Sequence, residues 1–96
     1  MEFEWDRQKN HTNYAKHKIN FEFASKVFDD PFAAFRFDRV ANGEERWLVV
    51  GKALQMHVLV VVHTYRIRAD KEIIRIISAR RATSHERRLY EEGGYS

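Results

Sequence analysis

The sequence predicts an α+β domain in which an antiparallel β-sheet carries two helices from the N-terminal part and one from the C-terminal part. Residues 6–28 hold helix caps and apolar residues at helical spacing. Residues 32–80 hold four segments rich in β-branched and aromatic side chains, as in strands. With 96 residues, 44 % of them hydrophobic, the chain is long enough for one small core, so we expect a single domain over residues 1–96.

The first elements are a short strand and two helices. Residues 3–5 are expected to form the strand, and Asp6 is a plausible N-cap for a polar helix that runs to about His17. Asn20 can cap a second helix over residues 21–28, whose apolar residues recur at helical spacing. Pro31 and the aspartates before it end that helix, because the residue before a proline avoids helical backbone angles.

Four strands and a final helix follow. The strands are predicted over residues 32–38, 45–53, 58–66 and 72–80, with Asn42-Gly43 as the first turn. The run 58–62 is apolar on both faces, which predicts a central strand covered on both sides for part of its length. Thr83-x-x-Glu86 is a capping box that predicts a helix over residues 84–92.

Strict alternation along the last strand sorts its side chains into two sets. It predicts that Ile74, Ile76, Ser78 and Arg80 share one face, while Arg75, Ala79 and Arg81 share the other. Helices packed mainly on one face leave the opposite face of the sheet open.

Composition excludes several classes of protein. The chain has no cysteine, which excludes disulfides, iron–sulfur clusters and thiol catalysis. The acidic start, MEFEWD, is unlike a secretory signal, and the longest apolar run is too short to span a bilayer. These features favour a cytoplasmic protein without a membrane partner.

Positive charge is concentrated in the second half of the chain. Residues 1–48 have eight Lys/Arg and nine Asp/Glu, whereas residues 49–96 have nine and five, a net charge of +4. This density suggests an anionic partner, either nucleic acid or an acidic protein, although a solvated basic surface is equally consistent with charge alone. Most of these cations are arginines, whose planar fork suits phosphate and carboxylate groups.

Other kinds of site are not supported. The five histidines lack the spacing of a metal-binding helix, and His57 and His63 are about 20 Å apart along a strand. The four glycines form no phosphate-binding loop, and no serine has the context of a nucleophile. We therefore expect neither a metal nor a cofactor. Arginines on an open sheet face can instead hold a phosphodiester and stabilise its transition state, unless each is simply solvated or ion-paired.

Two separated motifs resemble the BrnT family of bacterial toxins. The second ends in Ala79-Arg80-Arg81-Ala82-Thr83-x-x-Glu86-Arg87, and the first begins with Trp5-Asp6-x-x-Lys9-x-x-x-Asn13-x-x-Lys16-His17. The resemblance covers about residues 5–91. Lys18 departs from it, because BrnT-like sequences commonly have glycine there; a left-handed lysine would cost about 1 kcal/mol.

The resemblance implies a RelE-like fold and a metal-independent ribonuclease activity that blocks translation. It also implies a BrnA-type antitoxin with a ribbon-helix-helix part, through which the complex contacts operator DNA. In RelE-type toxins the ribose 2′-hydroxyl is the internal nucleophile. The expected substrate is therefore RNA.

We assign candidate roles to nine residues. Arg80 is the first choice for a phosphate clamp, and Arg81 is second because it has opposite strand parity. His63 is a candidate acid or base, with a buried core histidine as the equal alternative. Tyr90 either reaches the site or packs on the sheet. The candidate RNA contacts are Lys9, Arg46 and Arg66 for the backbone and Trp47 and Tyr65 for base stacking, with core packing more plausible for Trp47.

Two other function classes remain open. A non-catalytic binding module would use the basic face only to dock an acidic protein or a nucleic acid. A sequence-specific DNA-binding protein is less well supported, because no helix-turn-helix with a basic recognition helix is recognisable.

Overall fold

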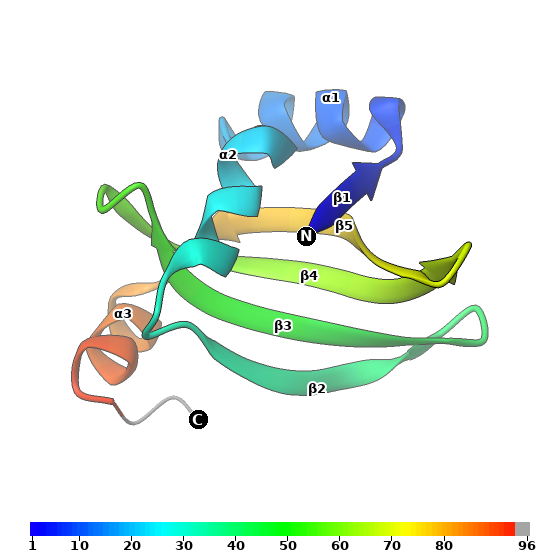
Figure 1. The fold of residues 1–96 in the computed structure, drawn as a ribbon. Helices are drawn as coiled ribbons and strands as arrows, with labels where there is room; N and C mark the ends of the chain where they lie inside the picture. The colour runs from blue at the N-terminus through cyan, green and yellow to red at the C-terminus, as the bar shows by residue number, and fades with distance from the viewer. Residues whose placement is uncertain (94–96) are drawn as a thin grey trace.

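A five-stranded sheet organises the chain, in the order β1-β5-β4-β3-β2 (Figure 1). The structure is a computed structural model that describes residues 1–93. Its elements match the predicted order of strands and helices. They are β1 (Glu2–Trp5), α1 (Arg7–His17), α2 (Phe21–Ser25), the 3-10 helix η1 (Lys26–Asp29), β2 (Ala34–Ala41), β3 (Glu44–Ala53), β4 (His57–Arg68), β5 (Lys71–Arg81) and α3 (Ser84–Glu91).

The sheet is mixed rather than wholly antiparallel. Strands β2 to β5 are joined by hairpins and pair antiparallel, but β1 lies parallel to β5, with Glu2 opposite Ile73 and Trp5 opposite Ile76. This corrects the antiparallel prediction. The two strands that pair here lie at opposite ends of the chain, so no turn between them could reveal their direction.

The N-terminal helices begin where the sequence predicts. The Asp6 side chain accepts a hydrogen bond from the Lys9 N–H at 3.0 Å, and Asn20 caps α2 in the same way. Helix α1 ends with Lys18 in the left-handed region, at φ 60° and ψ 28°, so the chain keeps this cap without glycine. The predicted helix over residues 21–28 is divided, since its last turn tightens into η1 before Pro31.

The main core lies between the sheet and the N-terminal helices. Its side chains include Phe21 of α2, Val27 of η1, and Val49, Val61 and Ala79 on β3, β4 and β5. A smaller cluster on the opposite face contains Val50, Val58 and Val60, against which Tyr90 of α3 packs. The predicted burial of β4 on both faces is thus confirmed, and α3 is not on the same face as α1 and α2.

A β-bulge in β5 changes the predicted alternation. Val62 pairs with Ser78 but the next residue, His63, pairs with Ile76, so Ile77 is an extra residue. Ile76 therefore lies on the same face as Ala79, in the main core, rather than beside Arg80 as alternation predicts. Sequence spacing cannot reveal a bulge of this kind, because a single inserted residue reverses the parity of everything before it.

Two buried polar side chains bind backbone groups at sheet edges that no strand within residues 1–93 covers. Asn13 of α1 donates to the Ala79 carbonyl at 2.9 Å and accepts from the Ala79 N–H at 3.1 Å, beyond the end of β1. Asp30 accepts from the Lys52 N–H at 2.8 Å, beyond the start of β2. Both contacts satisfy backbone groups that would otherwise be unpaired in the interior.

Two hairpins of equal loop length differ in how well their turns fit. Asn42-Gly43 and Ala69-Asp70 each form a two-residue loop with both residues at positive φ. Asparagine and glycine suit such a turn, whereas alanine is strained there.

Replacing Ala69 by Asn together with Asp70 by Gly should therefore stabilise the fold by about 1 kcal/mol, because it relieves left-handed strain. For a domain of this size that corresponds to a rise of roughly 4–8 °C in the melting temperature. Differential scanning calorimetry measures this melting temperature. Gly43→Ala is the matched control: its added Cβ meets no atom within 4 Å but its φ is +76°, so it should lower the melting temperature. An unchanged melting temperature for both variants would show that left-handed strain does not limit the stability of these turns.

Candidate functional site

The sheet face opposite the main core carries a pocket of about 250 Å³ built around Arg80. The floor is formed by residues that pair across the sheet, with Leu48 opposite Val62 and Val62 opposite Ser78. Three further features complete the wall: Arg80 beside Val60, Asp38 from β2 and His17 from the end of α1. We call this the Arg80 pocket; the residues that line it are His17, Asp38, Leu48, Val60, Val62, Ser78, Ala79 and Arg80.

The Arg80 guanidinium is oriented by Glu86 of α3. Its Nη1 and Nη2 donate to the two carboxylate oxygens of Glu86 at 2.8 and 3.0 Å. Glu86 also accepts from the Thr83 N–H in the predicted capping box. The hydrogen bonds from Arg80 lower the pKa of Glu86 to about 2, so this carboxylate is ionised at neutral pH. The Arg80 side chain remains 43 % exposed.

A second pocket of about 280 Å³ continues from the Arg80 pocket along α1. His17 and Ser78 line both pockets, so the two meet at the β5 edge. The walls of the second pocket include Lys9 and Lys16, both exposed. We call this second pocket the α1 groove. It places Lys9, a predicted backbone contact, in a pocket that shares two lining residues with the Arg80 pocket.

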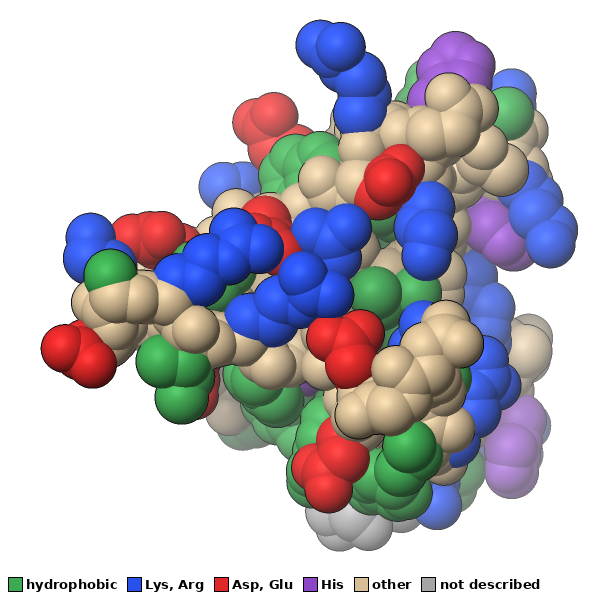
Figure 2. Space-filling model, turned by 90° about the vertical axis from the view of Figure 1, so that its right-hand side faces the viewer, with side chains coloured by type: hydrophobic (Ala, Val, Ile, Leu, Met, Phe, Trp, Pro, Cys, Tyr) green, Lys and Arg blue, Asp and Glu red, His purple; other side chains and the backbone are tan. Residues whose placement is uncertain are grey.

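Arg66 lies in a different cluster, near the β4–β5 turn. It pairs with Glu44 at 3.0 Å and lies 3.6 Å from Glu4, which also binds Arg68 and Arg75 at 2.7 and 2.8 Å. In Figure 2, the end of the sheet that carries these turns shows Lys and Arg side chains with acidic ones between them. Arg66 is six positions along β4 from Val60, the partner of Arg80, which is a distance of about 20 Å.

The predicted gathering of arginines is therefore wrong in part. Arg66 and Arg80 are at opposite ends of the same face, and each is paired with a carboxylate. Arg81 is exposed and pairs with Leu59, whose side chain belongs to the main core, so it lies on the other face from Arg80. Arg46 is half-buried beside Arg39, and its buried Nε has no hydrogen-bond partner within residues 1–93.

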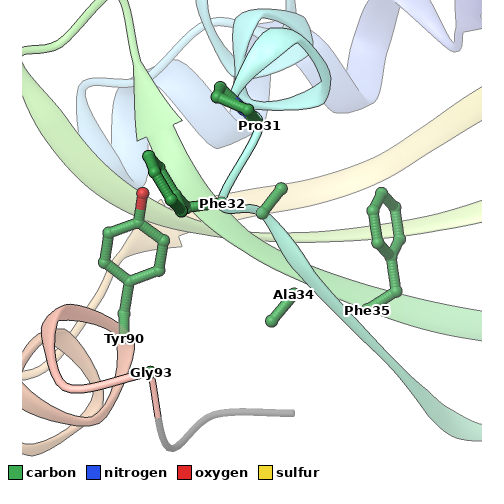
Figure 3. A pocket seen from close by; sticks show the side chains of 7 residues that line it. Pro31, Phe32, Ala34, Phe35, Tyr90 and Gly93 are labelled. Atoms are coloured by element: carbon green, nitrogen blue, oxygen red, sulfur yellow. The ribbon is translucent and has the colours of Figure 1, made fainter.

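Tyr90 does not reach the Arg80 pocket. Its hydroxyl donates a short hydrogen bond to buried Asp30, and its ring packs in the smaller cluster. Burial and the neighbouring Asp30 carboxylate both raise the pKa of Tyr90, which keeps the hydroxyl protonated. In Figure 3 its side chain points from α3 toward Phe32, in a mainly apolar pocket that Pro31 and Phe35 also line. The packing alternative for Tyr90 describes its position.

His63 lies among aromatic rings on the face that carries the main core. The rings of Phe28, Phe35 and Tyr65 approach it at 5.0, 6.0 and 5.2 Å, and the histidine is fully buried. A neutral ring fits its contacts, with Nδ1 donating to the Val61 carbonyl and Nε2 accepting from the Tyr65 hydroxyl. Burial lowers the pKa of His63 to about 4. It is a core histidine, on the opposite face from Arg80.

The two predicted stacking residues belong to the same aromatic surface. Tyr65 is 40 % exposed, so one side of its ring can meet a base, whereas Trp47 is half-buried and packs edge-on against Phe37 at 5.6 Å. Neither lines the Arg80 pocket.

Three polar residues of the Arg80 pocket were not predicted as site residues from the sequence: His17, Asp38 and Ser78. His17 was expected only as the approximate end of the first helix, and residue spacing could not reveal a second bulge, at Asp38 in β2. The only signal for Ser78 was its predicted place on the same strand face as Arg80, two residues further along the chain. Within residues 1–93, no three His, Asp or Glu side chains are grouped as metal ligands, and no helix is long and apolar enough to span a bilayer.

Comparison with known proteins identifies the family. A family model described as the ribonuclease toxin, BrnT, of type II toxin–antitoxin systems matches residues 5–86. The chain belongs to the BrnT family. A search of curated proteins finds no match.

The fold agrees with a solved structure of the same family. The chain is similar to the crystal structure of the Brucella abortus ribonuclease toxin BrnT, with a TM-score of 0.61 and 20 % sequence identity. The match covers 88 % of this chain and 99 % of the Brucella chain. At this identity the likeness shows a shared α+β fold. Membership of a type II toxin family also implies an antitoxin partner.

The burial of His63 predicts a pH-dependent loss of stability. The unfolded ring takes up a proton below about 6.5, while the folded ring resists protonation down to about 4. The unfolded state therefore binds more protons in this window, and stability falls as the pH drops from about 6.5 to 4, by about 3 kcal/mol in all.

Urea denaturation at a series of pH values measures this loss. His63→Gln should remove most of the dependence in that window, and the exposed His85→Gln should retain it. A wild-type protein whose stability is constant from pH 6.5 to 4.5 would contradict the assignment of a neutral buried ring.

Proposed function

We propose that this chain is a metal-independent endoribonuclease toxin that blocks translation in the cytoplasm by cutting RNA. The observation that carries the proposal is the Arg80 pocket, because it brings a half-exposed arginine, a histidine and an aspartate together in one depression of the sheet. Membership of a family of ribonuclease toxins supports the activity. All residues needed come from one chain, so we propose that residues 1–96 act as one RelE-like toxin domain.

Arg80 is proposed to bind the non-bridging oxygens of the scissile phosphodiester. A guanidinium presents several N–H groups in one plane and keeps its charge at all relevant pH values. Two hydrogen bonds to the Glu86 carboxylate, of 2.8 and 3.0 Å, hold the guanidinium plane in place. Little reorganisation is therefore needed when negative charge develops on the phosphate. The ribose 2′-hydroxyl then serves as the nucleophile, and no metal-bound water is required.

Flanking nucleotides are proposed to contact the other basic and aromatic residues. The RNA backbone is proposed to run through the α1 groove past Lys9. Arg46 and Arg66 lie farther along the same sheet face as Arg80. Tyr65 and Trp47 lie on the opposite sheet face from Arg80, so they stack on bases only if the RNA strand bends around the edge of the sheet. Arg81, His63 and Tyr90 receive no catalytic role in this proposal.

The proposed partner is a BrnA-type antitoxin with a ribbon-helix-helix part. In this proposal operator DNA contacts only the antitoxin, and the toxin surface meets RNA or the antitoxin.

A second candidate function is binding without cleavage. The cluster of Arg66, Arg68 and Arg75 supports it, because these three guanidinium groups share the two carboxylates of Glu4 and Glu44 and so retain a net positive charge for an acidic protein or a nucleic acid. This function needs no contribution from the Arg80 pocket.

Cleavage of RNA in the presence of EDTA tests the first proposal directly. Purified protein should cut single-stranded RNA under these conditions, and Arg80→Ala should lower the rate by about 100- to 1,000-fold, as expected for the loss of a transition-state charge. Gel separation of end-labelled RNA measures the rate. Arg81→Ala removes the same charge from the other face and should stay within about threefold of wild type. Equal losses for both variants would disprove the assignment, and tight binding without cleavage would favour the second candidate.

Expression in a bacterial host tests the toxin role. Induction should arrest growth and lower protein synthesis, measured by incorporation of labelled amino acids, and Arg80→Ala should not. Co-expression of a neighbouring reading frame that encodes a ribbon-helix-helix pattern should restore growth. Arrest that persists in cells expressing Arg80→Ala would show that toxicity does not depend on this pocket.

A further inference from the structure

Two residues without an assigned role line the Arg80 pocket from opposite sides. His17 enters from the last residue of α1, beside β5, and Asp38 enters from β2, on the far side of β3 and β4. Arg80 and the apolar floor of Leu48, Val60 and Val62 lie in the same pocket. The pocket therefore has an imidazole at one end and a carboxylate at the other.

Both ends of the pocket are shaped by irregular pairing. In β2, Phe37 pairs with Trp47 and Arg39 pairs with Arg46, so Asp38 is an extra residue. In β5 the extra residue is Ile77, directly before Ser78. Such bulges change the direction of a side chain and are frequent next to active sites. One bulge is at Asp38 itself, and the other lies directly before Ser78, which lines the pocket together with His17.

The position of α1 is fixed independently of any ligand. Asn13, four residues before His17, binds both backbone groups of Ala79 and also donates to the Ile19 carbonyl at 2.9 Å. The helix end is further set by the Lys18 N–H, which donates to the Tyr14 carbonyl at 2.8 Å. His17 is therefore held at the junction of the Arg80 pocket and the α1 groove before substrate arrives.

We propose that His17 and Asp38 are catalytic residues that form an acid–base pair for RNA cleavage, an inference that rests on the proposed ribonuclease function. Asp38 accepts the proton of the 2′-hydroxyl as the 2′-oxygen bonds to phosphorus. His17, as the imidazolium, donates a proton to the 5′-oxygen as its bond to phosphorus breaks. The products are a 2′,3′-cyclic phosphate and a 5′-hydroxyl. One proton is taken up and one is released, so the step needs no water and no other reactant.

The direction of the assignment follows from the surroundings. Attack and departure occur on opposite sides of phosphorus, so the base and the acid must be on opposite sides of the bound phosphate. A carboxylate only accepts protons when ionised, whereas imidazole exchanges them in both directions near neutral pH. The α1 groove, which Lys9 and Lys16 line, begins beside His17. The RNA on the 5′-oxygen side of the scissile bond therefore passes Ser78 and enters that groove.

A change of leaving group separates the acid from the base. The cleavage site of the wild-type enzyme is first mapped in a single-stranded RNA, and an oligonucleotide is then made in which sulfur replaces the bridging 5′-oxygen at that linkage. A thiolate departs without a proton, so the lost acid is no longer needed. With ordinary RNA, His17→Gln and Asp38→Asn should each be slower than wild type by about 100-fold or more. With the sulfur-containing oligonucleotide, His17→Gln should approach the wild-type rate and Asp38→Asn should stay slow.

Controls separate catalysis from structure and from the proposed function. His11→Gln, on the exposed part of the same helix, should cleave both substrates like wild type. Far-UV circular dichroism and the melting temperature should match wild type for all three variants. Normal cleavage of ordinary RNA by His17→Gln, or rescue of Asp38→Asn instead, would overturn the pair while leaving the ribonuclease function intact. Absence of cleavage by wild-type protein would remove both.

Discussion

The contact between the Asn13 side chain and the backbone of Ala79 is the constraint on which the arrangement of the site depends. Strand β1 covers β5 only as far as Ile76, so the remainder of β5 would be a bare edge with unpaired N–H and carbonyl groups. Asn13 satisfies both groups of Ala79 and is itself only 7 % exposed. An amide is well suited to this, because it offers a donor and an acceptor side by side.

Fixing α1 at that edge has a consequence for chemistry. The helix ends directly after His17, and its left-handed Lys18 turns the chain toward Ile19, which returns to the core. Asp30 acts in a comparable way at the other side of the sheet, where its carboxylate binds the Lys52 N–H and the Tyr90 hydroxyl. Although burial opposes ionisation, these hydrogen bonds lower the pKa of Asp30 below its ordinary value. One edge contact thus positions α1 and the other positions α3, and between them lies Arg80, which Glu86 of α3 orients.

Local signals in the sequence were sufficient for most elements and insufficient for their pairing. The caps at Asp6, Asn20 and Thr83 were predicted because each rests on a side chain and a backbone group only three residues apart. The parallel pairing of β1 and the bulge at Ile77 depend on strands distant in the chain, and the bulge placed Ile76 in the core against prediction. Which of Arg80 and Arg81 faces the pocket also depends on the register between β4 and β5.

The same distinction explains the candidate site. Arg80 could be selected from the sequence, because the end of a strand within a family-like motif is local information. His17 and Asp38 could not, since each becomes part of the pocket only through a long-range contact, the first by Asn13 and the second by the bulge in β2. His63 was attractive by residue type, but the rings of Phe28 and Phe35 enclose it. Burial by distant aromatic residues is a property of the folded chain.

The most direct measurement is an NMR titration of the ¹⁵N-labelled protein with a single-stranded oligodeoxynucleotide, which lacks the 2′-hydroxyl and so binds without being cut. If nucleic acid occupies the β5 edge, the largest shifts should fall on the amides of His17, Ser78 and Arg80 and along α1 at Lys9. Shifts confined to Arg66, Arg68 and Arg75, with none at the Arg80 pocket, would contradict this placement of the nucleic acid.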